Sequence, residues 1–600
     1  MHVMLKSRWL VRPWAQTAVS IASGALLGLC VLSFPGVAAA YEPTTTLAGL
    51  TEQAALSSRL HRRLVDRMSF SLGLFEPLRL DFAALKPELA HSLHVRLQAL
   101  DDGQGYAPET LARQTGQSRP ARRQHALGWL TAGTVIELVP AGRQRHHFLE
   151  PRSGRGLFRL AGQTAVSAAA QAVREGMSTT RQLLAGAAVD GTGVAAPDWI
   201  SDPLNEFGVA AFFAAYERAV CEKTPTARES ALAEALLAAG AIVGVLEQVG
   251  DPAHVRNDLA DVVSGTYQRF VGEQYGRAGI PAPGSLPTEA LLPHRLRDLF
   301  TTPSGLGLAD RTARRFFSSG SLPGTELGNI PALAGQPPLP SPPFTDAQGQ
   351  PIAEIVTPPS WPRAASGYLS SPQLKHLAVW DRRSSAELDP RTGEPQQNLH
   401  FSLDEACYAD YAALLLPEIG RYAQVALDYL FRGELQLVLT TTGAEPQLSV
   451  QVAETALGSG TVTVLVEKPE GTRSTLRTLS TVPTRPGATL ASLPLRAEDV
   501  KDARRVVVLF RGRDRHNEPI VTSAQLLLPT AEDAAASSAD AATQATESKS
   551  GSTDAAGASD DAKSDAQGDG AASSKSDSTP PPSKEPAKDR ELAPLHLKNF

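Results

Sequence analysis

The spacing of apolar residues changes once along this chain, close to Gly433. Before this point apolar residues recur every three or four positions, as on the buried face of a helix, and after it they alternate with polar residues, as on a strand. The alternating or apolar runs are 435–439, 448–452, 462–466, 506–510 and 526–528. We therefore expect a mainly α-helical domain over residues 41–432, followed by a small all-β domain over residues 433–530. Short strands separated by turn residues predict an immunoglobulin-like β-sandwich.

Two segments of the first part have strong helical patterns. Thr226 and Glu229 have the spacing of a capping box after Pro225, and an apolar stripe follows them. The segment 207–221 is apolar on nearly every side. We expect both segments to be helices in the core.

A third helical segment runs over residues 405–431, and Pro417 inside it is expected to kink the helix or divide it into two. Prolines recur over residues 321–372, before this segment. Because helical sequence resumes afterwards, we expect an extended proline-rich insertion within the helical domain.

The two ends of the chain have compositions unlike the rest. Basic residues are followed by an uncharged stretch from Pro13 to Ala40, which ends in three alanines. This pattern predicts a signal peptide over residues 1–40 that is cleaved before Tyr41, with an uncleaved membrane anchor as the alternative. Residues 531–600 contain Phe600 as their only aromatic residue, so we expect a disordered low-complexity tail. The expected location is the periplasm or the outside of the cell.

Charge and cysteine content exclude several classes of protein. The net charge is −6 over 600 residues, which provides no strong signal for nucleic-acid binding. Three cysteines are too few for a disulfide-rich scaffold or a thiolate-rich zinc protein. Cys221 and Cys407 remain after the predicted cleavage, and either a disulfide between them or two buried free thiols would suit an exported protein.

Two polar segments carry the most specific pattern. One is Asp251-Pro252-Ala253-His254-Val255-Arg256-Asn257-Asp258, at the end of the long apolar helix, and the other is His147-Phe148-Leu149-Glu150-Pro151. Together they resemble the secreted zinc-dependent phospholipases C and the related fungal single-strand-specific nucleases. The resemblance implies a mainly α-helical fold around a trinuclear zinc cluster, which activates water for phosphodiester hydrolysis.

The resemblance places only two zinc ligands on matching residues, His147 and His254, and assigns them to different zinc ions. The family positions that hold other residues here are Leu47, Leu138, Gly244, Gln248, Ser264 and Gln268. Zinc in a protein needs imidazole or anionic ligands, and one ligand per ion is too few to hold it. We therefore expect that the zinc cluster is absent and that no cofactor is bound.

A rearranged zinc site remains an alternative. Its candidate ligands are the two histidines with Glu137, Glu150, Asp251 or Asp258, and His254 and Asp258 would share a face of a continuous helix. Without metal, His254 is expected to cap a helix and His147 to lie in a solvated basic loop.

Arginines accompany both polar segments. Arg143, Arg145 and Arg256 could bind phosphate groups through their guanidinium forks, or form salt bridges with nearby carboxylates such as Glu150 and Asp251. The first interpretation suggests an anionic phospholipid or another envelope component as partner.

The sequence thus predicts an exported phospholipase C-like protein that serves as a non-catalytic binding or structural module of the cell envelope. The alternatives are an active zinc-dependent phosphodiesterase of phospholipase C or nuclease type, and an adhesion or docking function that resides in the β domain.

Overall fold

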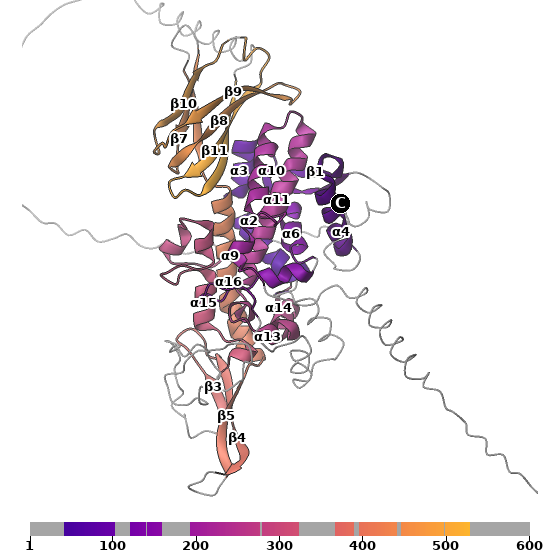
Figure 1. The fold of residues 1–600 in the computed structure, drawn as a ribbon, viewed down its shortest axis with the longest axis vertical. Coiled ribbons are helices and arrows are strands. Elements are labelled where there is room, and N and C mark those ends of the chain that lie inside the picture. The colour runs from indigo at the N-terminus through magenta and orange to yellow at the C-terminus, as the bar shows by residue number, and fades with distance from the viewer. Residues whose placement is uncertain are drawn as a thin grey trace, which may run out of the picture. The chain divides into compact units, whose positions relative to one another are not determined.

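The computed structural model of the chain describes residues 41, 43–101, 121–139, 141–158, 193–276, 279–322, 366–388, 395–440, 446–496 and 498–528. These residues belong to one compact unit that ends at Thr530 (Figure 1). The predicted signal peptide, residues 323–365 of the proline-rich insertion and the predicted tail lie outside the described residues.

Helices dominate the part before residue 431. The helical segments are η1 (Pro43–Leu47), α2 (Ala48–Ser57), α3 (Leu60–Met68), η2 (Gly73–Phe75), η3 (Phe82–Ala84), α4 (Pro87–Asp101), α6 (Ala126–Ile136), η4 (Ala141–His146), α9 (Ala196–Trp199), α10 (Val209–Cys221), α11 (Pro225–Gln248), α12 (Pro252–Val255), α13 (Leu259–Ser264), α14 (Thr266–Tyr275), η5 (Thr288–Leu291), η6 (Leu296–Leu299), α15 (Leu308–Arg315), η7 (Ser319–Ser321) and α16 (Glu405–Leu430). A helical part followed by a β part is confirmed.

Strands occur in both parts. They are β1 (Pro77–Asp81), β2 (Ala121–His125), β3 (Ser366–Leu369), β4 (Ala378–Leu388), β5 (Pro395–Ser402), β6 (Leu435–Thr440), β7 (Gln447–Val452), β8 (Leu457–Glu467), β9 (Arg473–Thr481), β10 (Thr489–Pro494), β11 (Arg505–Asp514) and β12 (Pro519–Leu527). The antiparallel pair β1–β2 and the antiparallel sheet β3-β4-β5 interrupt the helical part. The prediction of a mainly α-helical part did not include these strands, because they are too short or too polar to show a clear period of two.

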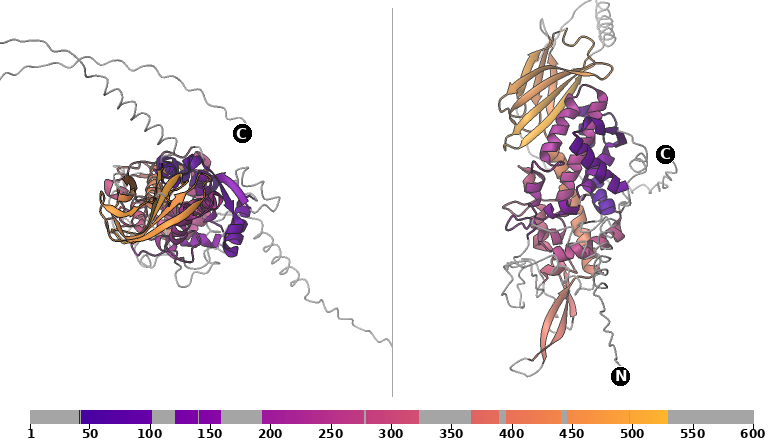
Figure 2. Two further views of the ribbon diagram at one scale, coloured as in Figure 1. Left: turned by 90° about the horizontal axis from the view of Figure 1, so that it is seen from above. Right: turned by 45° about the vertical axis from the view of Figure 1, so that its right-hand side comes forward.

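The long helix α11 is buried on all sides over most of its length, and it runs beside α16 (Figures 1 and 2). Among the described residues it is the helix with the length and composition of a membrane span, but 94% of that apolar stretch is buried inside the protein, as in a core helix. Its N-cap differs from the prediction. The side chain of Thr224, not Thr226, accepts the N–H of Ala227, because Pro225 occupies the first helical position, where it is well tolerated.

Helix α11 packs against α6 through glycines. A Cβ atom at Gly240 would lie 1.9 Å from the carbonyl oxygen of Leu130, and one at Gly133 would lie 2.1 Å from that of Leu237. No larger residue fits at either position, so the backbones of the two helices are in direct contact there.

Pro417 does not divide α16, which continues from Glu405 to Leu430. The helix is buried along much of one side among the other helices. This packing maintains a helix across a residue that removes one internal hydrogen bond.

The strands after residue 433 form two antiparallel sheets, ordered β10-β7-β6 and β12-β11-β8-β9. Apolar side chains from both sheets share one buried core, which includes Val450, Val464 and Phe510. In the immunoglobulin constant arrangement the fourth strand belongs to the sheet of the first, second and fifth strands. Here the fourth strand, β9, pairs with the third, β8, because a tight turn at Gly471 joins them as a hairpin. Strands β9 and β10 had no counterpart in the predicted runs.

Strands β8, β11 and β12 of the larger sheet have buried side chains on both faces, whereas most of β9 is exposed. Leu465, Val507, Leu509 and Val521 point away from the shared core of the two sheets and join the hydrophobic core of the helices. The uninterrupted apolar run 506–510 is the sequence signature of such a strand.

A buried carboxylate connects this sheet to the helices. Glu467, at the end of β8, forms ion pairs with Arg473 at 2.7 Å and Arg505 at 3.0 Å, and Arg228 of α11 lies 3.6 Å away. Arg473 also donates to the carbonyl oxygen of Val220, near the end of α10, at 2.6 Å. A guanidinium of the β part therefore lies at the C-terminal end of α10, which carries the negative end of the helix dipole.

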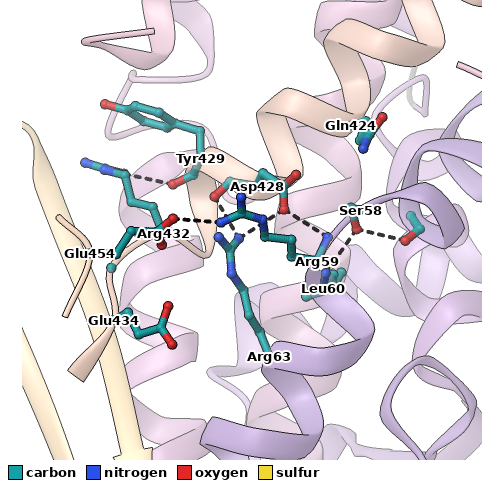
Figure 3. Close-up of polar contacts among 12 residues, drawn as sticks. Ser58, Arg59, Leu60, Arg63, Gln424, Asp428, Tyr429, Arg432, Glu434 and Glu454 are labelled. Atoms are coloured by element: carbon teal, nitrogen blue, oxygen red, sulfur yellow. Dashed lines mark hydrogen bonds and ion pairs between the residues drawn. The ribbon is translucent and has the colours of Figure 1, made fainter. Parts of the chain in front are cut away.

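Helices α3 and α16 meet the β part through a second polar network (Figure 3). Arg59 pairs with Glu454 at 2.7 Å, and Arg63 donates to the backbone oxygen of Asp428 at 2.8 Å and to its carboxylate at 3.2 Å. The buried Arg63 joins α3 to α16, and the largely exposed pair of Arg59 and Glu454 makes the contact with the β part, so this pair contributes little to stability.

Candidate functional site

Six of the twelve residues predicted from the zinc family meet inside the helical part, where α6, η4, α11, α12 and α14 come together. We call this set the polar core cluster. Its members are Glu137, His147, Gln248, Asp251, His254 and Gln268, all of them buried.

Glu137 follows the last turn of α6 and has no exposed surface. Its carboxylate accepts from Arg143 at 2.5 Å and from the indole N–H of Trp199 at 2.7 Å. Burial alone would raise the pKa of Glu137, but the hydrogen bonds and positive charge of His147 and Arg143 outweigh it and lower the pKa to about 2. Glu137 is therefore a buried anion whose counter-charge comes from the protein itself.

His147 is also fully buried, so the loop after α6 is not the solvated basic loop that we expected. Its Nδ1 lies 3.0 Å from Oε1 of Gln248, and its Nε2 lies 3.5 Å from Oε1 of Glu137. Both ring nitrogens thus already face side chains of the cluster.

His254 lies in the short helix α12, beyond the end of α11, and does not cap the long helix. Its ring stacks on Phe148 with 4.4 Å between centroids, and its Nδ1 lies 3.6 Å from Oδ2 of Asp251. Among the described residues, neither ring nitrogen has a hydrogen-bond partner. Burial lowers the pKa of His254, against the raising effect of Asp251.

Asp251 is the N-cap of α12, where its Oδ1 accepts the N–H of Ala253 at 2.9 Å. Its Oδ2 accepts from Nε2 of Gln268 at 2.5 Å. At position 268, where the family carries a zinc ligand, this chain therefore has an amide side chain that donates a hydrogen bond to a carboxylate.

The remaining lost-ligand positions do not converge on a cavity. Leu47 and Leu138 belong to the hydrophobic core, and the hydroxyl of Ser264 bonds to Asp261 at the end of α13. At Gly244 a Cβ atom would lie 2.8 Å from Cγ2 and 3.1 Å from Cα of Thr134. The position at which the family carries a histidine is filled by the contact between α11 and α6.

Two other predicted ligands lie apart from the histidines. Glu150 is in a surface turn, where it accepts the backbone N–H groups of Arg152 and Ser153. Asp258 does not share a helical face with His254, because α12 ends at Val255 and α13 begins only at Leu259.

The predicted phosphate-binding arginines are engaged internally. Arg143 is buried against Glu137 and Asn205, and Arg256 donates to the backbone oxygens of Ala313 and Phe316. Arg145 is partly exposed and donates to the ring of the neighbouring residue His146 at 3.1 Å. The salt-bridge alternative fits Arg143, although its partner is Glu137 and not Glu150 or Asp251.

Sequence reasoning missed a second buried group beside the cluster. Glu247 accepts a hydrogen bond from Thr51 at 2.9 Å, and the same hydroxyl lies 2.9 Å from that of Thr134. Burial raises the pKa of Glu247 well above its ordinary value. Charged residues inside an otherwise apolar helix were the available signal, but Thr51 is distant in sequence and could not be paired with Glu247.

Zinc fits this donor set poorly. Among the residues that the structure describes, no group of three or more His, Cys, Asp or Glu side chains could hold a metal ion. The carboxylate nearest to His147 is neutralised by Arg143, and no side chain can project from position 244. We therefore derive no reaction step through zinc.

Cys221 and Cys407 are free thiols in the structure. Cys407 lies in the first turn of α16, about 35 Å of helix away from the end at which the β part begins. Cys221 ends α10, beside Arg473 of the β part. The structure contains no disulfide between these two cysteines.

An open cleft lies away from the polar core cluster. It has a volume of about 690 Å³ and lies between α3 and the β part (Figure 3). Its lining residues are Ser58, Arg59, Arg62, Glu434, Ala453 and Glu454. Its cationic and anionic side chains are balanced, so it has no preference for either sign of charge.

Comparison with known proteins provides little further identification. No protein-family model matches the sequence, and no curated protein matches it. Among solved structures, the alpha toxin from Clostridium absonum aligns with a TM-score of 0.26 and 10% identity, over 82% of this chain and 96% of that chain. A score this low does not show a common fold.

Proposed function

We propose that this chain is an exported protein whose helical part has the phospholipase C type of fold without its zinc cluster, and that it serves as a non-catalytic binding or structural module of the cell envelope. Its C-terminal part is then an accessory β-sandwich related to the immunoglobulin type. The resemblance of the segments around His147 and His254 supports the family assignment.

The observation that carries the proposal is the ion pair between Glu137 and Arg143. A guanidinium lies 2.5 Å from the carboxylate nearest to His147, so a cation of the protein provides the charge that a metal would provide. Binding zinc there would require the arginine to leave a buried position in which it also contacts Asn205 and Trp199. The close contact at Gly244 supports the same conclusion for the neighbouring zinc position.

Metal analysis combined with a phosphodiesterase assay tests the proposal. We expect the purified full-length chain to contain less than stoichiometric zinc and to leave bis(p-nitrophenyl) phosphate intact, with or without added zinc. Stoichiometric zinc that is lost in both His147→Ala and His254→Ala, but not in the exposed control His294→Ala, would refute it.

The competing function is a zinc-dependent phosphodiesterase with a rearranged site. The free ring nitrogens of His254 are the observation that favours it, because they could accept a metal after a local shift. Hydrolysis that requires both buried histidines would establish this function in place of the first.

Export is tested separately. We expect the chain recovered from the periplasm or the medium to begin at Tyr41 by mass spectrometry, whereas an uncleaved anchor would leave the first 40 residues attached.

A further inference from the structure

A second buried acidic site lies between α13 and η7, outside the polar core cluster. Asp258 and Asp261 are buried there, with 0% and 5% exposure. Oδ2 of Asp258 accepts the N–H of Gly320 at 2.6 Å, and Oδ2 of Asp261 accepts the N–H of Ser319 at 3.0 Å. Because the two donors are adjacent amides of one chain, the two carboxylates are held side by side.

The pair has no counter-charge among the described residues. Neither carboxylate forms an ion pair there, in contrast to Glu137. Burial and the charge of Asp258 raise the pKa of Asp261 to about 7, and Asp251 adds to the effect. Two neighbouring carboxylates inside a protein cannot both ionise without a cation or a shared proton.

Neutral oxygen atoms beside the pair also lack partners. The hydroxyl of Ser318 is 1% exposed and lies beside Asp258, where it lowers the pKa of that carboxyl, yet it forms no hydrogen bond of good geometry with any described residue. The side-chain amide of Asn257, next to Asp258 in the chain, is 2% exposed and is likewise unpaired within the described part of the chain.

The carboxylates retain acceptor capacity as well. An ionised carboxylate offers about four lone-pair positions. Asp258 receives the N–H groups of Gly320 and Asp261, and Asp261 receives the N–H and hydroxyl of Ser319 with a longer contact from Ser264. Each carboxylate therefore has at least one position left for a cation.

We propose that Asp258 and Asp261, with the hydroxyl of Ser318, bind one hard divalent cation of the calcium type. Oxygen ligands with two negative charges match such an ion, whereas the absence of imidazole and thiolate among these three side chains disfavours zinc. Water completes its coordination. The bound ion holds η7 against α13 at the point where the chain enters the proline-rich insertion.

Calcium titration of the chelator-treated full-length chain tests this site. We expect one calcium ion per chain and a melting temperature that rises with calcium concentration. Asp261→Asn keeps the shape of the side chain but removes one charge, so it should weaken calcium binding at least about tenfold, because the charge of the ligands sets the affinity of such sites. Asp258→Asn should act in the same way.

Asp310→Asn is the matched control. Asp310 is a buried carboxylate of α15 that accepts from Thr301, Thr302 and Gly307, like the pair but without a second acid. This variant should melt at a lower temperature and retain the full calcium-dependent rise.

Two results would overturn the proposal. One is a wild-type chain that shows neither bound calcium nor a calcium-dependent rise in melting temperature, which would indicate that the pair holds a proton instead. The other is a rise that persists unchanged in Asp261→Asn, which would place the ion elsewhere. The test does not depend on zinc content or hydrolysis, so its failure is separate from failure of the proposed function.

Discussion

Replacing Glu467 by Gln should destabilise the helical and β parts together. This carboxylate is 5% exposed, and three guanidinium groups surround it. Arg473 lies 2.7 Å away, Arg505 3.0 Å and Arg228 3.6 Å, with side-chain exposures of 1%, 12% and 8%. The substitution removes their shared anion and leaves a neutral amide of nearly the same size.

The expected cost is about 3–5 kcal/mol of unfolding free energy, because removing one partner of a buried ion pair leaves an uncompensated charge. Burial already lowers the pKa of Arg228 to about 10, together with the charge of Arg473, even while Glu467 is present. The carbonyl oxygens of Val220 and Gly471 remain as acceptors, so the lower half of the range is the more reasonable expectation.

Tryptophan fluorescence during urea unfolding shows whether the substitution in the β part also destabilises the helical part. None of the six tryptophans lies within residues 433–530, and Trp129, Trp199 and Trp380 are buried in the helical part. A shift of the fluorescence transition by a substitution in β8 therefore reports coupling between the two parts. Circular dichroism should show the same shift.

Glu454→Gln is the matched control at the same boundary. Its carboxylate is 42% exposed and pairs with Arg59, which is 54% exposed, so its loss should cost less than about 1 kcal/mol. A fluorescence transition that Glu467→Gln leaves unchanged would refute the reasoning, because the β part would then unfold independently.

Three further outcomes follow from the buried groups. The pKa of Glu137 is about 2 in the folded protein against an ordinary 4.5, so its ionised carboxylate should contribute up to about 3 kcal/mol to the free energy of unfolding above pH 4.5. This contribution is lost as the pH falls toward 2. Acid unfolding of Glu137→Gln should therefore depend less on pH in this window, and an unchanged profile would contradict the prediction. Gly244→Ala should lower the free energy of unfolding by about 1–3 kcal/mol, because the added methyl group overpacks against Thr134. Adding Thr134→Ser should recover part of this loss in urea unfolding. An unchanged stability of Gly244→Ala would show that α6 and α11 can separate. Cys221 and Cys407 should both be alkylated in the unfolded chain without reductant, and a mass that changes only after reduction would demonstrate a disulfide instead.

The hydrophobic pattern predicted the elements that pack by their own periodicity. The apolar helix α11 and the strands β6, β7, β8, β11 and β12 follow from local spacing, because a buried face needs apolar residues at a fixed interval. Strands β1 to β5 were not predicted. Their conformation depends more on the strands with which they pair than on the pattern of their own side chains.

The polar core cluster was predicted only in part, and the reason is sequence distance. His147 and Gln248 are 101 positions apart and Trp199 is 62 positions from Glu137, so local patterns hold no information about these contacts. Asp258 and Asp261 form their site with Ser319 and Gly320, about 60 positions later.

The sequence by itself determined that the chain is helical first and strand-forming afterwards, since periodicity is a local property of adjacent residues. Only the tertiary structure decided which buried charged side chains form pairs with each other. Arg143 reaches Glu137, and glycines bring α11 against α6 where a histidine would otherwise project. Such contacts depend on the packing of whole helices, because a buried polar group is stable only beside a partner that the fold brings to it.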